Sequence, residues 1–278
     1  MECVEDYFIF NGEIKSTLEF DDKYVKVGEV LYEVIRVIKG EPLYLEEHLR
    51  RLDNTAKITN RNLWLNSSQI EAAIYKLINK SKVDYGNIKI IFNFNDMNNF
   101  LIYFLEHSYP TPNMYKDGVH TIIYKGERTN PNAKVVDLTF RSIVNEEIKR
   151  SNAFEAILVD RNGFVTEGSK SNIFMIKGDK VITSPTKDVL PGVTREVILD
   201  ILRKLKIEIC EEKVHYNDIK NLDALFISGT SPKVLPIKSV GKDEFLSSSN
   251  KILKLIMDKY NSDVEKYIYE KSRCNIKD

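Results

Sequence analysis

Apolar and polar positions in the first hundred residues follow two periods, and each predicts a different kind of element. Short apolar runs bounded by Gly, Pro, Asn or Asp predict strands, and the Asn11-Gly12 pair is typical of a hairpin turn. Apolar residues repeated at helical spacing predict amphipathic helices. Strands are expected at residues 7–10, 31–38, 43–45, 88–94 and 100–105. Helices are expected at residues 46–58 and after a cap at Ser67 or Ser68, with a buried stripe of Ile70, Ala73, Ile74, Leu77 and Ile78.

A break in this pattern separates a second set of elements from the first. The segment Ser108-Tyr-Pro-Thr-Pro-Asn113 has two prolines in a polar setting, which is typical of a linker. We therefore expect a small N-terminal domain at residues 1–108, a linker at 109–113 and a larger C-terminal domain at 114–278. In the second half, strands are expected at 119–124, 155–160, 172–176, 207–210 and 224–228, and helices at 138–150, 193–205 and from about 250. The charged tail at 265–278 looks dispensable, and it is expected to be helical or frayed.

Composition and charge narrow the class of protein. The 278 residues carry 41 Lys plus Arg and 41 Asp plus Glu, so a nucleic-acid or acidic-membrane partner is not expected. No apolar run approaches the ~18 residues that span a bilayer, and the acidic start does not resemble a signal peptide. The scattered cysteines (Cys3, Cys210, Cys274) and four histidines lack metal-ligand spacing. We expect a cytoplasmic protein without a metal site.

Glu167 is notable because it lies between two runs that read as strands, in the segment Val165-Thr-Glu-Gly-Ser-Lys-Ser-Asn-Ile-Phe174. A carboxylate at the edge of a buried sheet needs a cationic or proton-donating partner, since burial without one is costly. The alternative is a solvated glutamate in a turn. The segment by itself leaves both interpretations open.

Two further segments carry backbone N–H groups suited to an anion. Residues 190–195 open an amphipathic helix, so Val193 and Thr194 lie at its N-terminus, where free N–H groups and the helix dipole favour phosphate. The turn at Thr230 and Ser231 follows an apolar strand and offers N–H and hydroxyl donors. Each segment is equally compatible with a plain helix start or a plain loop.

Arg51 is a candidate cation for such an anion. It lies beside His48 and Thr55 on the predicted helix at 46–58, away from the apolar stripe. Its guanidinium could clamp a phosphate, or it could pair with Glu47 one turn earlier. The chain thus offers two anion-binding segments, one arginine and one carboxylate near a strand edge.

The sequence resembles the class IV pyridoxal-phosphate enzymes (fold type IV), the family of branched-chain and D-amino-acid aminotransferases and of 4-amino-4-deoxychorismate lyase. The resemblance extends from Asn11-Gly12 to about Pro236. Its segments, in the family's order, are Tyr32-Glu-Val-Ile-Arg-Val37, Leu45-Glu-Glu-His-Leu-Arg-Arg-Leu52, 155–174, 190–195 and 228–236. It implies a two-domain α/β (α+β) fold: a small α/β domain and a larger domain with a barrel-like mixed sheet and flanking helices. It also implies a homodimer.

The resemblance implies a role for each matching residue. Lys134 matches the lysine that forms a Schiff base with pyridoxal 5'-phosphate, although nothing local distinguishes it from the other lysines. Glu167 matches the carboxylate that pairs with the pyridine nitrogen. Arg51, Val193, Thr194 and Thr230 match the phosphate-binding set, and Leu190 matches the residue packed on the cofactor ring. Tyr32 and Ser231 match positions that face the substrate.

The implied activity is transfer of an amino group between an amino acid, of branched-chain or D-amino-acid type, and a 2-oxo acid. A lyase that releases pyruvate and 4-aminobenzoate is the alternative, because residues 92–96 lack the arginine that often holds the substrate carboxylate in the aminotransferases. Lys170, where a small residue is common, and the single Gly28 in 20–29 are further departures. A non-catalytic relative would be expected to lose Lys134 or Glu167, and both are present. Substrate identity and chirality stay open.

Overall fold

The computed structural model describes residues 2–95 and 97–274, and they group into two compact units. The first unit consists of Met1–Ser108, Ala133–Val136 and Val264–Asp278, and the second consists of Tyr109–Asn132 and Asp137–Asp263. The expected mixed α/β fold class is confirmed. The grouping differs from the predicted domains in two segments, because residues 133–136 and those from 264 onward were expected in the C-terminal domain.

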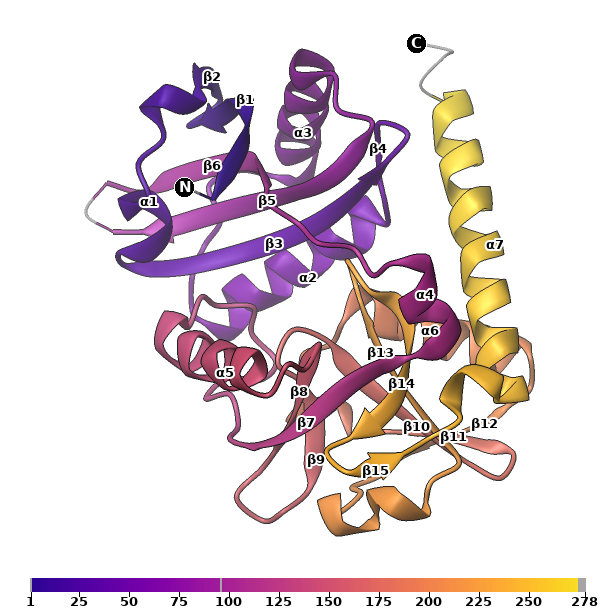
Figure 1. Cartoon of the computed structure of the whole chain (residues 1–278). Coiled ribbons are helices and arrows are strands. Elements are labelled where there is room, and N and C mark those ends of the chain that lie inside the picture. Colours follow the sequence, from indigo (N-terminus) through magenta and orange to yellow (C-terminus); the bar gives the residue numbers. More distant parts are fainter. Residues whose placement is uncertain (1, 96, 275–278) are drawn as a thin grey trace. The chain divides into compact units, whose positions relative to one another are not determined.

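The first unit is built on a six-stranded antiparallel sheet with the order β2-β1-β6-β5-β3-β4 (Figure 1). Its strands are β1 (Cys3–Phe10), β2 (Glu13–Ser16), β3 (Glu29–Ile38), β4 (Glu41–Pro42), β5 (Tyr85–Phe94) and β6 (Asn99–Leu105). Its helices are the 3-10 turn η1 (Thr17–Glu19), α1 (Lys23–Lys26), α2 (Leu45–Ile58) and α3 (Ser67–Ser81).

Helices α2 and α3 cover one face of this sheet. Their apolar stripes, which include Leu49, Leu52 and Ile74, pack in one buried cluster with Leu31 and Ile35 of β3. The opposite face carries a second cluster, here called the aromatic cluster after its members Phe8, Phe20, Tyr32 and Tyr103, which also contains aliphatic side chains. Because side chains alternate along a strand, odd-numbered residues of β3 face the helices and even-numbered residues face the aromatic cluster.

The second unit is built on a nine-stranded mixed sheet with the order β12-β11-β10-β13-β14-β7-β8-β9, in which β15 pairs with β14. β9 also contacts β10, so the sheet curls back towards itself. The strands are β7 (Val119–Lys125), β8 (Glu155–Val159), β9 (Val165–Gly168), β10 (Asn172–Lys177), β11 (Lys180–Thr183), β12 (Glu208–Glu211), β13 (Ala224–Gly229), β14 (Lys233–Val240) and β15 (Asp243–Glu244).

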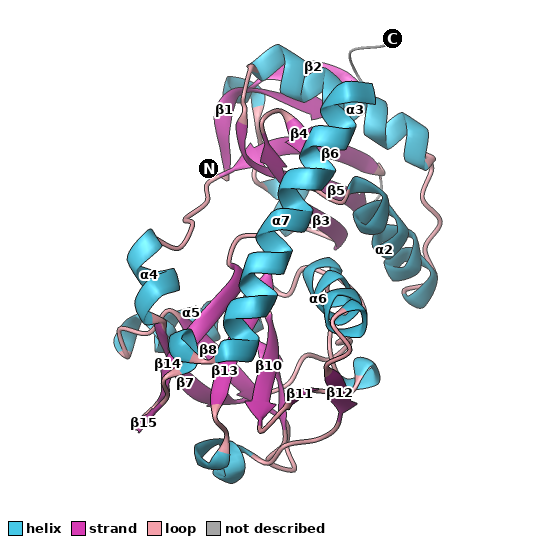
Figure 2. Ribbon diagram, turned by 90° about the vertical axis from the view of Figure 1, so that its right-hand side faces the viewer, coloured by secondary structure: helices cyan, strands magenta, loops and turns pink. Residues whose placement is uncertain are grey.

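The helices of the second unit flank this sheet (Figure 2). α5 packs through Val144 on Ala156 and Leu158 of β8, and α6 contacts β12 and β13. α7 begins in this unit, and its last part groups with the first unit. The helices are α4 (Pro112–Asp117), α5 (Leu138–Arg150), η2 (Thr186–Asp188), α6 (Val193–Lys204), η3 (Tyr216–Asn221), η4 (Ser247–Ser249) and α7 (Lys251–Cys274).

Several local predictions are corrected by the backbone. The strand expected at 43–45 is wrong, because Tyr44 has a left-handed conformation (φ 54°) and α2 begins at the next residue. The cap of α3 is Asn66, whose side chain accepts from Gln69 N–H, and not Ser67 or Ser68. In the predicted linker, Thr111 caps α4 and Pro112 is its first residue.

The charged tail is helical where the structure describes it, which is one of the two expected alternatives, but it is not a loose end. Within it, residues 265–274 continue α7, and Ile268 is buried; residues 275–278 lie outside the part that the structure describes. No helix among the described residues is long and apolar enough to cross a bilayer. Within the same residues, no group of three or more His, Cys, Asp or Glu side chains has a metal-binding arrangement.

Candidate active site

Lys134 lies in a short extended segment that joins the sheet of the first unit. Its carbonyl accepts from Tyr32 N–H at 3.2 Å, and Val136 N–H donates to the carbonyl of Val30 at 3.0 Å. Its own N–H donates to the Thr55 hydroxyl oxygen of α2 at 3.3 Å. The backbone at this lysine is therefore held between β3 and α2, the two elements that carry Tyr32 and Arg51.

The side chain of Lys134 reaches the aromatic face of the same sheet. Its Nζ lies 4.6 Å from the ring centroid of Tyr32, and Lys89 Nζ lies 5.5 Å from that ring. Tyr32 is almost fully buried. An ammonium over an aromatic ring is attracted by the ring quadrupole, so Tyr32 contributes to orienting the lysine side chain.

Arg51 is buried and makes a bidentate ion pair with Glu33. Its Nε donates to Glu33 Oε1 at 2.7 Å, and its Nη2 donates to Oε2 at 2.6 Å. His48 Nδ1 lies 2.9 Å from Glu33 Oε2. Glu33 is thus a partner of Arg51 that was not predicted, since only a phosphate and Glu47 were expected from the sequence.

Electrostatics in this cluster favours a carboxylate and a neutral imidazole. Burial by itself raises the pKa of Glu33, but the charge and hydrogen bonds of Arg51, with the hydrogen bond of His48, outweigh it and lower the pKa to about 2. Burial lowers the pKa of His48, the charges of Arg51 and Lys134 act in the same direction, and Glu33 opposes them.

Glu167 is a buried residue of β9, 4% exposed, so the alternative of a solvated turn glutamate is wrong. Its Oε2 accepts from Leu190 N–H at 3.0 Å, and its Oε1 lies 3.5 Å from Nη1 of Arg128. These are the proton-donating and cationic partners that a buried carboxylate requires. Leu190, predicted to pack on the cofactor ring, is thus placed directly beside the carboxylate.

Asn172 connects Leu190 to the start of helix α6. Its Nδ2 donates to the Leu190 carbonyl at 2.8 Å, and its Oδ1 fills the space that a Cβ on Gly192 would need. Gly192 is the N-cap and supplies no side-chain cap. The first backbone N–H groups of α6, including those of the buried Val193 and Thr194, point out of the helix start, as expected for an anion-binding terminus.

The turn that holds Thr230 and Ser231 joins β13 to β14 and belongs to the same neighbourhood. Ser228 pairs with Asn172 across β13 and β10, which places the turn two residues beyond that pair. The Ser228 hydroxyl is buried and has no hydrogen-bond partner within the described part of the chain. The second unit thus brings Glu167, Leu190, the start of α6 and this turn together.

These residues fit a pyridoxal phosphate. A buried carboxylate suits a protonated ring nitrogen, an uncapped helix start suits a phosphate, and the buried Ser228 hydroxyl offers a further donor. Lys134 and Arg51 supply an amine and a guanidinium in the first unit. The predicted site residues thus form two groups. The first unit holds Lys134, Arg51 and Tyr32, and the second unit holds the others: Glu167, Leu190, Val193, Thr194, Thr230 and Ser231.

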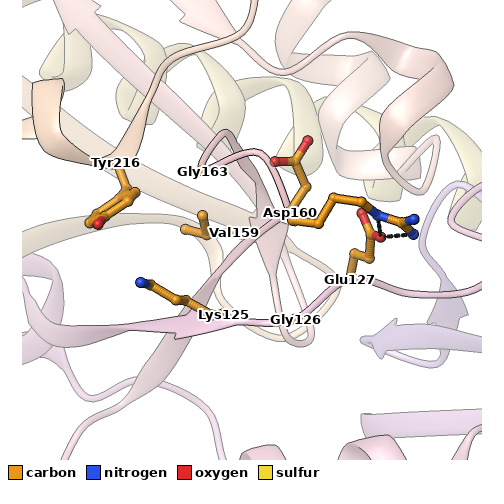
Figure 3. Close-up of a pocket in the computed structure, with 8 residues that line it drawn as sticks. Lys125, Gly126, Glu127, Val159, Asp160, Gly163 and Tyr216 are labelled. Carbon is orange, nitrogen blue, oxygen red and sulfur yellow. Dashed lines mark hydrogen bonds and ion pairs between the residues drawn. The ribbon is translucent and has the colours of Figure 1, made fainter.

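Figure 3 shows a pocket of about 420 Å³ that has no part in these groups. It is lined by the ends of β7 and β8 and by Tyr216, and its Glu127 pairs with Arg161. Another pocket, of about 560 Å³, lies at Lys39, Tyr75 and Lys82 in the first unit. No predicted site residue lines either pocket, so we assign the chemistry to neither.

Three supporting residues, Glu33, Arg128 and Asn172, were not predicted from the sequence. Glu33 had a usable signal, because it lies on the core-facing side of an apolar strand, where a carboxylate needs a buried cation. Asn172 and Arg128 had no comparable signal. Their partners lie 18 and 39 residues away along the chain, and no local period relates such positions.

Comparison with known proteins places the chain in a defined group. Residues 30–240 match the family described as Amino-transferase class IV. The D-alanine aminotransferase of Bacillus licheniformis is 25% identical over 248 residues, covering 84% of this chain and 87% of the relative. The branched-chain-amino-acid aminotransferase of Escherichia coli (strain K12) is 26% identical over 265 residues, covering 84% and 85%.

A longer relative matches over part of its length. The branched-chain-amino-acid aminotransferase-like protein 2 of Arabidopsis thaliana is 27% identical over 239 residues, which are 79% of this chain and 42% of that protein. The chain therefore spans less than half of the length of this relative.

Solved structures share the fold. The branched-chain amino acid aminotransferase of Escherichia coli superposes with a TM-score of 0.85 at 22% identity, covering 94% of this chain and 95% of the other. A T.th. branched-chain amino acid aminotransferase with pyridoxamine 5'-phosphate gives 0.84 at 19% identity, covering 95% of each chain. A Legionella pneumophila chain described as a candidate 4-amino-4-deoxychorismate lyase gives 0.78 at 22% identity, covering 88% and 94%.

Proposed function

The chain belongs to the class IV aminotransferase family, and we propose that it is a pyridoxal-phosphate-dependent aminotransferase. It would move an amino group between an amino acid, of branched-chain or D-amino-acid type, and a 2-oxo acid. Two relatives support this range of donors. One is a D-alanine aminotransferase, and the other is a branched-chain-amino-acid aminotransferase. The family resemblance further implies a homodimer, which sedimentation analysis would test.

The observation that carries the proposal is the position of Lys134. Only the family resemblance distinguishes this residue from the other lysines of the chain. Its N–H bonds to Thr55, one helical turn after Arg51, and its carbonyl bonds to Tyr32. Lys134, Arg51 and Tyr32, whose roles the family resemblance implies, thus share one small region of the first unit.

We assign the following roles. Lys134 would carry the cofactor through its amine, and that amine, once it is free, would take the substrate's Cα proton and return it. Glu167 holds a proton at the pyridine nitrogen. The phosphate is bound by Arg51, the N–H groups at Val193 and Thr194, and Thr230, while Leu190 packs on the ring and Tyr32 and Ser231 contact the substrate. Bound pyridoxal phosphate supplies an aldehyde for the amine and a ring that accepts electron density from Cα.

A donor and acceptor screen tests the activity. The holoenzyme should form glutamate from 2-oxoglutarate with at least one L- or D-amino acid of the branched-chain or alanine type. Borohydride reduction followed by peptide mapping should place the pyridoxyl label on Lys134, and Lys134→Ala should remove label and activity. A label on another lysine, or no glutamate from any donor, would contradict the proposal.

The lyase alternative has one supporting observation. The strand β5 and the turn after it, from Phe92 to Asn95, carry no arginine that could hold a substrate carboxylate. The same Lys134 and Glu167 would then serve release of pyruvate and 4-aminobenzoate from 4-amino-4-deoxychorismate. Pyruvate formed without any oxo-acid acceptor would favour the lyase, and glutamate formed from 2-oxoglutarate would favour the aminotransferase.

A further inference from the structure

Three ionisable side chains are buried together where α2 crosses β3 in the first unit. Glu33 is 0% exposed, His48 is 3% and Arg51 is 9%. Glu33 projects from the sheet face that packs on α2, between Leu31 and Ile35 of the apolar core. His48 and Arg51 lie one turn apart on α2, so both reach the same carboxylate.

A buried ion pair of this kind is weak evidence for a purely stabilising role. Removing both charges from water has a desolvation cost that is comparable to their attraction, and well-packed apolar residues often serve stability equally well. What the pair does supply is geometry. Glu33 engages the Nε and Nη2 edge of a planar guanidinium, and two parallel hydrogen bonds fix the orientation of that plane.

His48 adds a second restraint on the same carboxylate. Its Nδ1 lies 2.9 Å from Glu33 Oε2 and 3.4 Å from Arg51 Nη2. The shorter contact, to an anion, is a hydrogen bond in which Nδ1–H donates, so Nδ1 does not accept from Arg51. Glu33 Oε2 therefore receives one bond from His48 and one from Arg51, and the carboxylate cannot rotate without losing both.

The cluster also adjoins the segment that carries Lys134. Thr55 follows Arg51 by one turn on α2, and its hydroxyl oxygen accepts from Lys134 N–H at 3.3 Å. The positive charge of Lys134 acts on His48 and helps to lower its pKa. The guanidinium that Glu33 orients therefore lies on the helix that binds the backbone of Lys134, the residue that, under the proposed function, holds the cofactor.

We propose that Glu33, restrained by His48, is a positioning residue that sets the Arg51 guanidinium for the phosphate monoester of the cofactor. This inference rests on the proposed function, in which Arg51 binds that phosphate. Glu33 touches neither cofactor nor substrate in this role. It acts by fixing the plane of the Arg51 guanidinium before the phosphate binds. The side chain then loses less conformational entropy on binding, so the entropic cost of phosphate binding is smaller.

The test compares two ligands that differ only in the phosphate. Apoenzyme is titrated with pyridoxal phosphate and with pyridoxal, and the ratio of the two dissociation constants reports the contribution of the phosphate. Glu33→Gln should weaken pyridoxal phosphate binding about tenfold, as expected for loss of one charge-assisted interaction. Its affinity for pyridoxal should stay within about twofold of the wild type, because pyridoxal makes no phosphate contact.

Two controls make the result specific. Glu29 lies on the same strand as Glu33 and makes a partly exposed ion pair with Arg61. Glu29→Gln removes that carboxylate and should leave the dissociation constants of pyridoxal phosphate and of pyridoxal unchanged. In an Arg51→Lys background, Glu33→Gln should no longer change the ratio, because the two residues act as one unit. If Glu33→Gln does not fold, His48→Gln, which removes one donor only, should change the ratio in the same direction.

Two outcomes overturn the inference. Equal weakening for both ligands would mean that Glu33 supports the fold and not the phosphate clamp. An unchanged ratio in a folded variant would mean that Arg51 needs no positioning. The proposed function is judged separately, by the wild type: a wild-type protein whose reduced label lies on Lys134 keeps that function even if the Glu33 variants refute the positioning role.

Discussion

The anionic form of Glu33 is strongly favoured inside the first unit, and this links the stability of the fold to pH. Its pKa falls from an ordinary value of 4.5 to about 2, because Arg51 and His48 outweigh the effect of burial. A depressed carboxyl pKa stabilises the folded chain above the unfolded value, here by roughly 3 kcal/mol for a shift of this size. That contribution is lost as pH falls from 4.5 through 2.

We therefore expect the free energy of unfolding to fall steeply between pH 4.5 and pH 2. His48 acts in the same direction, because its lowered pKa makes the neutral form part of the fold and its contribution is lost as pH falls below 6.5. Denaturant unfolding at a series of pH values measures both. Glu33→Gln should reduce the fall of the free energy of unfolding below pH 4.5, and Glu29→Gln should not. If the free energy of unfolding depends on pH in the same way in Glu33→Gln and in the wild type, the lowered pKa of Glu33 is contradicted.

Glu167 and Glu155 are two buried carboxyl groups with different surroundings. Glu167 has Arg128 and the Leu190 N–H as partners. Glu155 is held by the hydroxyls of Ser169 and Ser171, and burial raises its pKa. The first environment favours a carboxylate that can hold a proton on a ring nitrogen, and the second favours a neutral structural group.

This contrast gives a prediction for catalysis. Glu167→Gln should lower turnover by about a hundredfold or more, because an amide cannot balance a protonated pyridine, while the lysine-linked cofactor is retained. Glu155→Gln should leave turnover near that of the wild type, since the Gln amide oxygen can accept from one of the two serine hydroxyls and its NH2 group can donate to the other. Steady-state transamination and cofactor titration measure the two effects, and equal losses in the two variants would refute the role of Glu167.

Among the elements, α3 shows how a helix start depends on backbone geometry. Asn66 has an extended backbone, and its side chain accepts from Gln69 N–H at 3.0 Å while Gln69 Oε1 accepts from Asn66 N–H at 2.9 Å. This reciprocal pair satisfies two N–H groups that the helix cannot. Ser67 and Ser68 have the right chemistry for a cap, but they lie inside the first turn.

Stability measurements distinguish the two assignments of the cap. Asn66→Ala should lower the free energy of unfolding by about 1 kcal/mol, because the Gln69 N–H loses its partner. Ser68→Ala should change it by no more than about 0.5 kcal/mol, since alanine is a better helix former and no cap is lost. A larger loss at Ser68 than at Asn66 would show that the helix begins elsewhere in solution.

At the scale of the whole molecule, α7 belongs to both units. Residues 251–263 group with the second unit, and the described residues from Val264 onward group with the first. There the Tyr267 hydroxyl accepts from Leu45 N–H at 3.3 Å and donates to Glu46 Oε2 at 3.0 Å. The segment that looked dispensable in the sequence thus caps the start of α2, the helix that carries Arg51.

Replacing Ile268, 5% exposed, by Ala should therefore lower the free energy of unfolding by about 2–4 kcal/mol through lost apolar burial and a cavity. The neighbouring Tyr269 is 61% exposed, and Tyr269→Ala should stay within about 0.5 kcal/mol of the wild type. Thermal and denaturant unfolding of both variants provide the comparison. Similar values for the two would indicate that this part of α7 is not packed in solution.

Local sequence patterns predicted the limits of two helices to within one residue. α5 was expected at 138–150 and has those limits, and α6 differs from its prediction by one residue. The strands β2, β11 and β14 and the two-residue strands β4 and β15 were not predicted. β2 has no fully buried residue, and β14 contains Pro236, so neither has the pattern of a typical strand.

The amino-acid sequence alone determined the residue types that the chemistry needs and the order of the motifs, which was enough to recognise the family. It did not determine which residues meet. Only the folded backbone placed the segment of Lys134 against β3 and α2, and only the crossing of α2 over β3 brought Glu33 to Arg51. The physical reason is the distance along the chain over which each signal acts. A hydrophobic period predicts burial within one helix or strand, whereas these contacts depend on how elements far apart in the chain pack together.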